Sequence, residues 1–253
     1  MNNIRNDFTC RLLADSGIRQ GMRILDVGCG TGDLSIMASE MMAHTGEVIG
    51  FDISAEVLAK ANQAVTEKQV ASVRFIQAEI ISLPADLALF DAIIGRRVLM
   101  YQSDAGESIN SLRPFLKPGG IMVFQESDSM AASLCDDSLK LHKKVQSWIW
   151  DTVKKEGGNV QMGSQLYSVM KRAGLNVRAL RAEAVLHTGE SGSDLAWVAK
   201  MMLPRMIDHG VILADEVDMD TLEQRLQSEL EGSNIPFIGG MEFGICAKVT
   251  NGW

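Results

Sequence analysis

The segment ILDVGCGTGDLSI, residues 24–36, constrains the fold more than any other part of the sequence. An apolar run ends in three glycines, Gly28, Gly30 and Gly32, and apolar residues with helical spacing follow them. This order is typical of a strand, a tight turn and a helix that begins beside a bound small molecule. The residues around the glycines indicate which molecule that is.

Strand and helix patterns alternate through the first half of the chain. They predict strands over 22–27, 47–52, 73–77, 90–95 and 121–126, and helices over 34–42, 55–66 and 105–115. Ser54 is the expected N-cap of the second helix. Strands that alternate with helices at this spacing form a parallel sheet with helices on both faces, which agrees with the apolar character of the strands.

The pattern changes after Glu126. We predict helices over 136–156, 163–173, 193–209 and 221–231, and strands over 175–184 and 243–249. Asp220, followed three residues later by Glu223, resembles a capping box at the start of the last helix. Because no internal repeat or low-complexity tract interrupts the chain, we expect one domain over residues 1–253, with helical additions at 127–160 and 190–240.

The glycine loop does not suit a phosphate group. It is one residue shorter than the dinucleotide pattern G-x-G-x-x-G and lacks the Lys-Ser/Thr ending of a phosphate loop. Asp33 opens the helix where a pyrophosphate would meet bare amides, and Asp26 adds a second acid. Asp52, at the end of the next strand, is placed to accept hydrogen bonds from ribose hydroxyls. A ribose, no pyrophosphate and cationic groups together describe S-adenosylmethionine.

Five segments occur in the order expected of class I methyltransferases: ILDVGCGTG, VIGFDIS, FIQAEIISLP, FDAIIGRRVLMY and LRPFLKPGGIMVFQE. They cover about residues 22–126, and the sequence resembles the ubiquinone/menaquinone methyltransferase-like branch of these enzymes. The later segments QMGSQLYSVMKRAGL and FGICAKV resemble small-molecule methyltransferases of bacterial secondary metabolism. The resemblance implies an α/β, Rossmann-like fold with a seven-stranded sheet of order 3-2-1-4-5-7-6, its last strand antiparallel.

The resemblance also implies S-adenosyl-L-methionine as cofactor, S-adenosyl-L-homocysteine as its product, and a set of cofactor-binding positions. Asp52 would hold the ribose, Ile53 would pack on the adenine, and Glu79 would accept from the adenine amino group. Arg96 would face the methionine end, with a structural ion pair as its alternative, and Asp26 would otherwise cap loop amides. The full set is Asp26, Gly28, Cys29, Gly30, Gly32, Asp52, Ile53, Glu79, Ile80 and Arg96, in which Cys29 is expected to fill the turn.

Methyl transfer from a sulfonium is an in-line displacement that needs neither a protein nucleophile nor a metal, so we expect no metal site. A general base is required only if the acceptor enters protonated. The catalytic group therefore stays open, with Tyr101, Glu126 and His142 as candidates. Tyr101 and Glu126 lie near the carboxyl ends of predicted strands, where open sheets bind ligands.

Aromatic and thioether side chains gather in the region after Glu126. They suit a bulky apolar ligand, and the alternative is that they form the core of the helical additions. The candidate acceptor-pocket residues are Met130, Trp148, Trp197 and Met201.

Charge and cysteine content limit the partners. The formal net charge is −8, with 24 basic and 32 acidic residues, which argues against a nucleic-acid partner. The four cysteines form no CxxC pair, and no apolar run approaches the roughly 20 residues of a membrane helix. The N-terminus does not resemble a signal peptide. We expect a cytoplasmic monomer or homodimer with no membrane partner.

The predicted function is transfer of a methyl group from S-adenosylmethionine to a small, largely apolar metabolite in bacterial secondary metabolism. The alternative is a cofactor-binding fold that now guides a non-methylating reaction, such as a cyclisation or rearrangement. Both keep the glycine loop and Asp52, so the sequence does not separate them.

Overall fold

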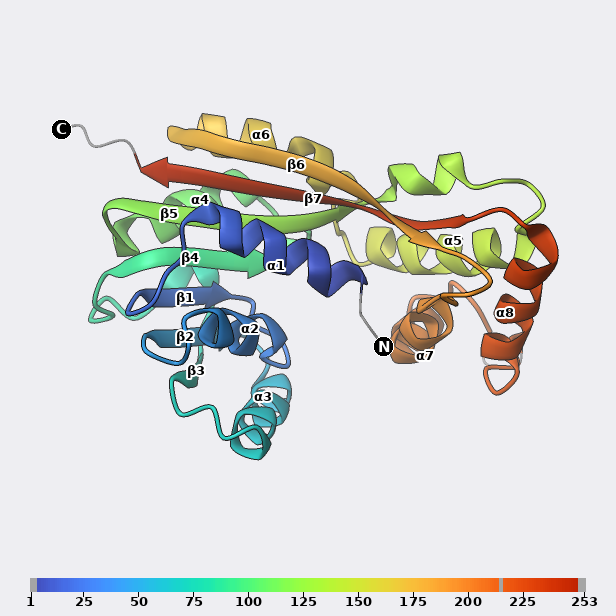
Figure 1. Cartoon of the computed structure of the whole chain (residues 1–253), viewed down its shortest axis with the longest axis horizontal. Coiled ribbons are helices and arrows are strands. Elements are labelled where there is room, and N and C mark those ends of the chain that lie inside the picture. Colours follow the sequence, from blue (N-terminus) through green and yellow to red (C-terminus); the bar gives the residue numbers. More distant parts are fainter. Residues whose placement is uncertain (1–3, 214–215, 250–253) are drawn as a thin grey trace. The chain divides into compact units, whose positions relative to one another are not determined.

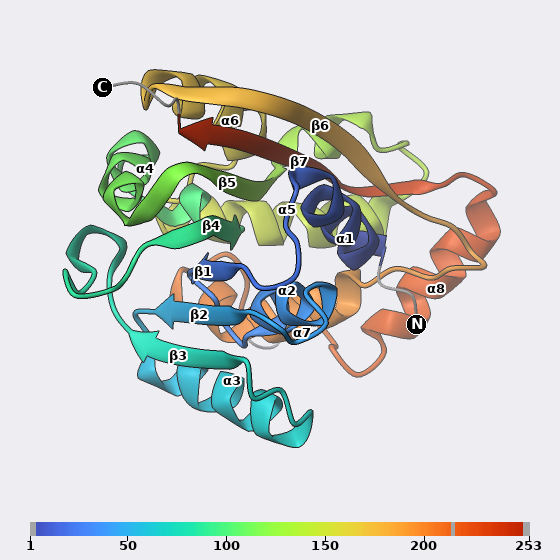
Figure 2. The ribbon, with the colours of Figure 1, turned by 60° about the vertical axis from the view of Figure 1, so that its left-hand side comes forward.

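The computed structural model describes residues 4–213 and 216–249. Its seven strands form one sheet of order β3-β2-β1-β4-β5-β7-β6, which confirms the predicted order (Figures 1 and 2). The strands are β1 (Arg23–Val27), β2 (Glu47–Asp52), β3 (Val73–Gln77), β4 (Phe90–Arg96), β5 (Leu116–Asp128), β6 (Leu175–His187) and β7 (Phe237–Val249). The α-helices are α1 (Ile4–Ser16), α2 (Asp33–Met41), α3 (Ala55–Glu67), α4 (Ala105–Leu112), α5 (Lys140–Lys155), α6 (Met162–Arg172), α7 (Leu195–Asp208) and α8 (Leu222–Ser233).

The central strands are parallel. Leu25 of β1 lies opposite Ile49 of β2 on one side and Ile93 of β4 on the other, and β3 and β5 continue the parallel pairing outward. The arrow of β7 points against those of β1 and β4, so the last strand is antiparallel, as predicted (Figure 1). The carboxyl ends of β1 to β5 therefore meet at one edge, where an open sheet binds its ligand.

The chain divides into two compact units. The first takes in the chain up to Glu126, Ser164–Arg181 and the chain from Phe243 onward; the second takes in Ser127–Gly163 and Ala182–Glu242. The predicted additions at 127–160 and 190–240 both fall inside the second unit.

In the first unit, α1 and α2 pack on one face of the sheet. Phe8 and Leu12 of α1 and Ile36 of α2 are buried in a core cluster with Ile24 and other strand residues. Leu25 follows Ile24 and points to the opposite face, where it is equally buried. Both faces of the sheet are thus covered, which explains the apolar character of the strands.

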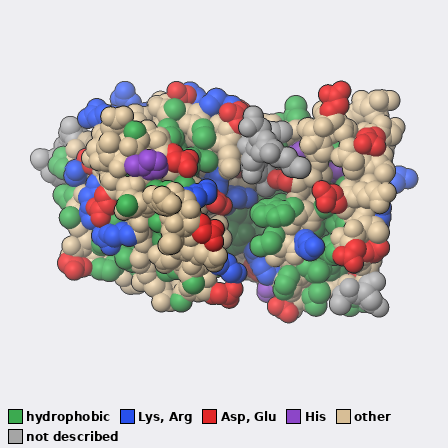
Figure 3. Space-filling model, turned by 60° about the horizontal axis from the view of Figure 1, so that its bottom comes forward, with side chains coloured by type: hydrophobic (Ala, Val, Ile, Leu, Met, Phe, Trp, Pro, Cys, Tyr) green, Lys and Arg blue, Asp and Glu red, His purple; other side chains and the backbone are tan. Residues whose placement is uncertain are grey.

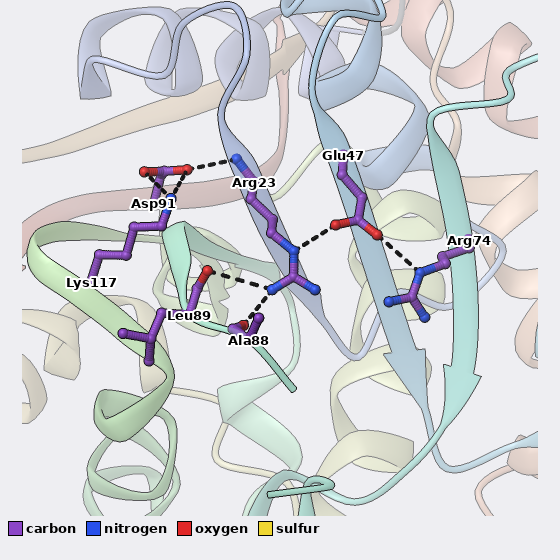
Figure 4. A network of polar contacts seen from close by, with 7 residues as sticks. All are labelled: Arg23, Glu47, Arg74, Ala88, Leu89, Asp91 and Lys117. Carbon is purple, nitrogen blue, oxygen red and sulfur yellow. Dashed lines mark hydrogen bonds and ion pairs between the residues drawn. The ribbon is translucent and has the colours of Figure 1, made fainter. Parts of the chain in front are cut away.

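Charged side chains tie the amino ends of the strands together (Figure 4). The guanidinium of Arg23 donates to Glu47 at 2.5 Å and to the carbonyl of Ala88, and it lies 4.3 Å from the ring centre of Phe90. Arg74 donates to the other oxygen of Glu47 at 3.1 Å. This network lies at the opposite end of the strands from the glycine loop, so it stabilises the sheet away from the ligand edge.

The second unit has a helical core of its own. Helices α5, α7 and α8 contact one another in all three pairings. Their buried residues include Trp148 of α5, Met206 of α7 and Leu226 of α8. The side-chain amide of Gln146 donates to the carbonyls of Ile238 and Gly239, which joins α5 to the start of β7.

Several boundaries differ from the predictions. Helix α1 was not predicted, although Phe8, Leu12 and Leu13 are spaced for one helix face. Helix α5 begins at Lys140 rather than 136, because Asp136 binds the amide and hydroxyl of Ser138 in a turn. Strand β5 begins at Leu116, so the KPGG segment lies within it, and β6 and β7 are longer than predicted.

The predicted capping box at Asp220 and Glu223 is wrong. The N-cap of α8 is Thr221, whose side chain makes no capping hydrogen bond. Instead, Asp218 accepts hydrogen bonds from the amide of Asp220 and from the amide and hydroxyl of Thr221. The aspartate two residues earlier forms the turn before the helix, and competition of this kind is common for Asp side chains. The predicted N-cap Ser54 is confirmed, since its hydroxyl accepts from the amide of Val57 at 3.3 Å.

Candidate functional site

The glycine loop after β1 adopts a backbone that favours glycine. Gly28, Gly30 and Gly32 have φ angles of 61°, 55° and 84°, all in the left-handed region. A Cβ atom on Gly28 would lie 2.5 Å from Cγ2 of Val98, so a side chain there would collide with the loop that follows β4. The amide of Cys29 donates to the carbonyl of Phe51 at 2.9 Å, which joins the loop to β2.

Asp52, at the end of β2, connects the loop to the next helix. Its Oδ2 accepts from the amide of Gly30 at 3.1 Å, and its Oδ1 accepts from the amide of Ser54 at 3.0 Å. Ser54 in turn caps α3. The carboxylate is therefore oriented by two backbone amides at the carboxyl edge of the sheet.

A cavity of about 480 Å³ opens at this edge, in the first unit. Six residues singled out from the sequence line it: Gly28, Asp52, Ile53, Glu79, Ile80 and Tyr101. Ten further lining residues were not singled out, namely Phe51, Ala78, Ile81, Arg97, Val98, Gln102, Ser103, Asp104, Glu107 and Ser108. Most of these follow β4, and their position just after a strand end was the signal available in the sequence.

The charge around the cavity is mostly negative. Its lining includes the acids Asp52, Glu79, Asp104 and Glu107, whereas Arg97 is the one basic residue of that lining in the described chain. The side chain of Asp104 is engaged at the start of α4, where it accepts from the amides of Gly106 and Glu107. An acidic lining suits a ligand with cationic groups better than one with phosphates.

Asp26 is fully buried beneath the loop and does not line the cavity. Its Oδ2 accepts from the hydroxyl of Ser35 at 2.5 Å, and its Oδ1 has no hydrogen-bond partner among the described residues. Burial raises the pKa of Asp26 to about 7, although the Ser35 hydrogen bond and the positive charge of Arg96 oppose this. Asp26 thus titrates near neutral pH beside the glycine loop.

Glu126, at the end of β5, is also fully buried. Its carboxylate accepts from the amides of Val98, Leu99 and Met100, at 3.0, 2.8 and 3.3 Å. Burial raises the pKa of Glu126 to about 7 even though these three hydrogen bonds favour the charged form. The carboxylate holds the loop after β4, which supplies much of the cavity lining, and does not itself line the cavity.

Arg96 and Cys29 also lie outside the lining. The guanidinium of Arg96 donates to Asn6 at 2.9 Å and to Thr9 at 3.4 Å, both on α1. Thr9 donates onward to Gln125 of β5 at 2.7 Å, so α1 is joined to the carboxyl ends of β4 and β5. Cys29 is buried, and burial raises the pKa of its thiol, which fits a filler of the turn rather than a nucleophile.

The remaining candidates belong to the second unit. Trp197 and Met201 lie one turn apart on α7 and are 65% and 64% exposed, and Met130 is also exposed. Trp148 is buried, with the ammonium of Lys144 5.2 Å from its ring centre. His142 is fully buried and bonds to Glu229, as described below.

No three His, Cys, Asp or Glu side chains within residues 4–213 and 216–249 come together as a metal site. In the same ranges, no helix combines the length and apolar character that crossing a membrane requires.

Comparison with known proteins identifies a family. Residues 18–174 match the model of a methyltransferase domain family. The chain is 40% identical over 123 residues to the ubiquinone/menaquinone biosynthesis C-methyltransferase UbiE of Stutzerimonas stutzeri, an alignment that covers 47% of this chain and 46% of that protein. The chain spans about half the length of the curated relatives that it matches.

Solved structures share the fold at low sequence identity. Phosphoethanolamine N-methyltransferase 2 of Haemonchus contortus, in complex with S-adenosyl-L-methionine, has a TM-score of 0.60 at 17% identity, covering 97% of this chain and 53% of that one. The cyclase SpnF has a TM-score of 0.60 at 20% identity, covering 97% and 82%.

Proposed function

The chain belongs to the methyltransferase domain family, and we propose that it transfers the methyl group of S-adenosyl-L-methionine to a small, largely apolar metabolite. The observation that carries the proposal is the acidic cavity at the carboxyl edge of the sheet, with Asp52 held between the amides of Gly30 and Ser54. Its volume of about 480 Å³ is within the usual range of small-molecule sites.

The residues of the cavity fit this cofactor. Asp52 would accept from the ribose hydroxyls, Ile53 would pack on the adenine, and Glu79 would accept from its amino group. When bound, S-adenosylmethionine supplies a methyl group on a positively charged sulfur. The acids of the lining favour that charge, and among the described residues that line the cavity Arg97 is the one basic side chain that could meet a phosphate.

The contribution of the protein to such a reaction is mainly positioning. The acceptor atom must be held about 3–3.5 Å from the methyl carbon, in line with the bond that breaks, and water must be excluded. Tyr101 is the catalytic candidate that lines the cavity, whereas Glu126 and His142 are buried and bonded elsewhere. We assign Tyr101 the task of accepting a hydrogen bond from a protonated acceptor, which orients the acceptor.

We assign acceptor recognition to the second unit, with Trp197 and Met201 as the first residues to test. Exposed aromatic and thioether groups on one helix face suit a bulky apolar ligand. The relatives named for C-methylation in ubiquinone and menaquinone biosynthesis make a quinone-like ring the first acceptor to try. We also propose that the methyl transfer is a step of bacterial secondary metabolism.

The proposal also includes a cytoplasmic monomer or homodimer that binds no nucleic acid. On the face shown in Figure 3, Lys and Arg side chains are interspersed with Asp and Glu, without a continuous basic surface. Together with the net charge of −8, this distribution disfavours a phosphate backbone as partner.

Calorimetry with S-adenosylmethionine, S-adenosylhomocysteine, NAD and ATP tests the cofactor. We expect binding of the first two only, and comparable affinity for NAD would contradict the proposal. Methyl transfer is then tested by incubating the protein with S-adenosylmethionine and reduced naphthoquinones, and measuring S-adenosylhomocysteine and methylated product together.

The second candidate is a non-methylating reaction such as a cyclisation, favoured by the likeness to the fold of the cyclase SpnF. The two functions differ in stoichiometry. Product formed without S-adenosylhomocysteine would support the second candidate, whereas equal amounts of the two would support methyl transfer.

A further inference from the structure

A serine, a histidine and a glutamate of the second unit form a hydrogen-bonded chain that the cofactor site does not use. His142 of α5 is fully buried, and its Nδ1 lies 2.7 Å from Oε2 of Glu229 on α8. On the other side of the ring, Nε2 lies 3.4 Å from Oγ of Ser193, between β6 and α7. The ring of Phe237 packs 4.6 Å from the ring centre of His142.

The hydrogen bonds among these three residues have a fixed direction because the carboxylate of Glu229 is held in place. Its carboxylate also accepts from the amides of Leu141 at 2.8 Å and His142 at 3.0 Å. Although burial opposes it, these amides and the His142 ring hold the pKa of Glu229 below its usual value. A carboxylate only accepts hydrogen bonds, so Nδ1 of His142 carries a proton. Burial lowers the pKa of His142, so the neutral ring turns its basic Nε2 toward Ser193.

Ser193 is half-buried and lies two residues before the start of α7. The first-turn amides of an α-helix have no acceptor within the helix, and α7 begins at Leu195. The amides at a helix N-terminus stabilise negative charge that develops nearby. Ser193 therefore has a base on one side and hydrogen-bond donors a short distance along the chain.

We propose that Ser193 is an activated nucleophile that takes an acyl group from a small activated ester, with His142 as its base and Glu229 as the residue that orients His142. The bond between Oγ and the carbonyl carbon forms, the ester C–O bond breaks, and the serine proton passes through Nε2 to the departing alcohol. Water then adds to the acyl-serine, its proton passes through His142 back to Oγ, and the carboxylic acid leaves. This site is independent of methyl transfer.

A fluorophosphonate reports such a serine directly. The Oγ–P bond forms as the P–F bond breaks, fluoride leaves, and the serine proton passes to His142. Intact-mass measurement of the full-length protein should show a single adduct, and peptide mass spectrometry should place it on Ser193. Hydrolysis of p-nitrophenyl acetate should fall to the background rate in Ser193→Ala.

Variants distinguish a Ser193 that is activated by His142 from one that is merely exposed to the reagent. Ser191→Ala is the matched control, because Ser191 lies on the same loop and bonds to Thr188 rather than to His142; it should label at the wild-type rate. His142→Gln should slow labelling by about 10²-fold or more, and Glu229→Gln should also slow it while the circular dichroism spectrum stays native. The proposal would be overturned by an absent adduct, by an adduct spread over several serines, or by labelling of Glu229→Gln at the wild-type rate. The hydrogen bonds among the three residues would then have only a structural role.

Discussion

The carboxylate of Asp52 holds the amide of Gly30, with Oδ2 3.1 Å from the amide nitrogen. Asp52 ends β2, whereas Gly30 lies in the loop that follows β1. The same carboxylate binds the amide of Ser54 through its other oxygen. One side chain therefore joins the glycine loop, the end of β2 and the start of α3. The ribose subsite proposed for this cavity is consequently preorganised by the fold itself.

Replacing Asp52 should weaken cofactor binding without unfolding the protein. Asp52→Ala removes the proposed ribose acceptor, and we expect affinity for S-adenosylhomocysteine to fall by about 1.5–3 kcal/mol, the range for hydrogen bonds to a charged group. Calorimetry measures the change, and circular dichroism checks the fold. Asp33→Ala is the control, since Asp33 begins the adjacent helix but does not line the cavity. Wild-type affinity in Asp52→Ala would remove Asp52 from the site.

Alanine at two positions of the glycine loop should have unequal costs. At Gly30 an added Cβ meets open space, so only the left-handed backbone is strained, at about 1–2 kcal/mol. At Gly28 the same strain combines with a contact of 2.5 Å to the stiff side chain of Val98. We expect Gly28→Ala to lower the free energy of unfolding further than Gly30→Ala in urea titrations. Equal losses would show that Val98 moves aside.

Stability should depend on the ionisation of Asp26. Its pKa is about 7 in the folded protein because of burial, against about 3.9 for a carboxyl in an unfolded chain. Between these two values the carboxyl of Asp26 is protonated in the folded state and ionised in the unfolded state. Its contribution to the free energy of unfolding is therefore full below about pH 4 and is lost as the pH rises through about 7. Asp26→Asn removes this loss, so its stability relative to wild type should increase from pH 5 to pH 8.

The difference in the free energy of unfolding between Asp26→Asn and wild type should change by at most about 1.4 kcal/mol per pH unit, and urea unfolding at several pH values measures it. Asp91→Asn serves as the control. Burial acts against ionisation of Asp91, but the hydrogen bonds from Lys117 and from the amide of Arg23 hold its pKa below the usual value. Its contribution is therefore lost only at acid pH, and its stability difference should stay flat from pH 5 to pH 8. A flat difference for Asp26→Asn as well would show that Asp26 is ionised throughout.

The network at the amino ends of the strands should affect stability alone (Figure 4). Arg23→Met removes the hydrogen bonds to Glu47 and the loop carbonyls and the contact with Phe90, which we expect to cost about 1–2 kcal/mol. Cofactor affinity should not change, because the network lies at the other end of the strands. Lys60→Met, which breaks an exposed pair within α3, should leave unfolding unchanged. A loss of cofactor binding in Arg23→Met would contradict this separation.

The two candidate tryptophans of the second unit should behave differently. Trp148 is 7% exposed, and Trp148→Ala should destabilise the protein by about 3–5 kcal/mol as a large cavity forms. Trp197 is 65% exposed, so Trp197→Ala should leave unfolding and cofactor affinity unchanged while it lowers turnover of the acceptor. Turnover at the wild-type level in Trp197→Ala would remove Trp197 from acceptor recognition.

Local patterns predicted the sheet because each of its elements has a short-range signal. The apolar strands, the glycines and the Ser54 cap all lie within a few residues of what they specify. The strand order, by contrast, was implied by the resemblance of the ordered motifs to class I methyltransferases. The boundaries that were wrong depended on competing side chains, as when Asp218 rather than Asp220 formed the turn before α8. Several turn-forming residues in one segment leave a sequence pattern ambiguous.

Of the candidate site, the sequence by itself determined the glycine loop and the place of Asp52, because the spacing between a strand end and its acid is a local property of the chain, whereas Ile53 was predicted from the family resemblance. Only the tertiary structure decided that Glu126 holds the loop after β4, that Arg96 bonds to α1, and that His142 lies between Glu229 and Ser193. These partners are separated by 27 to 90 residues. Their contacts exist because parallel strands and packed helices bring distant segments together, and burial then makes an unpaired polar group costly enough to select each partner.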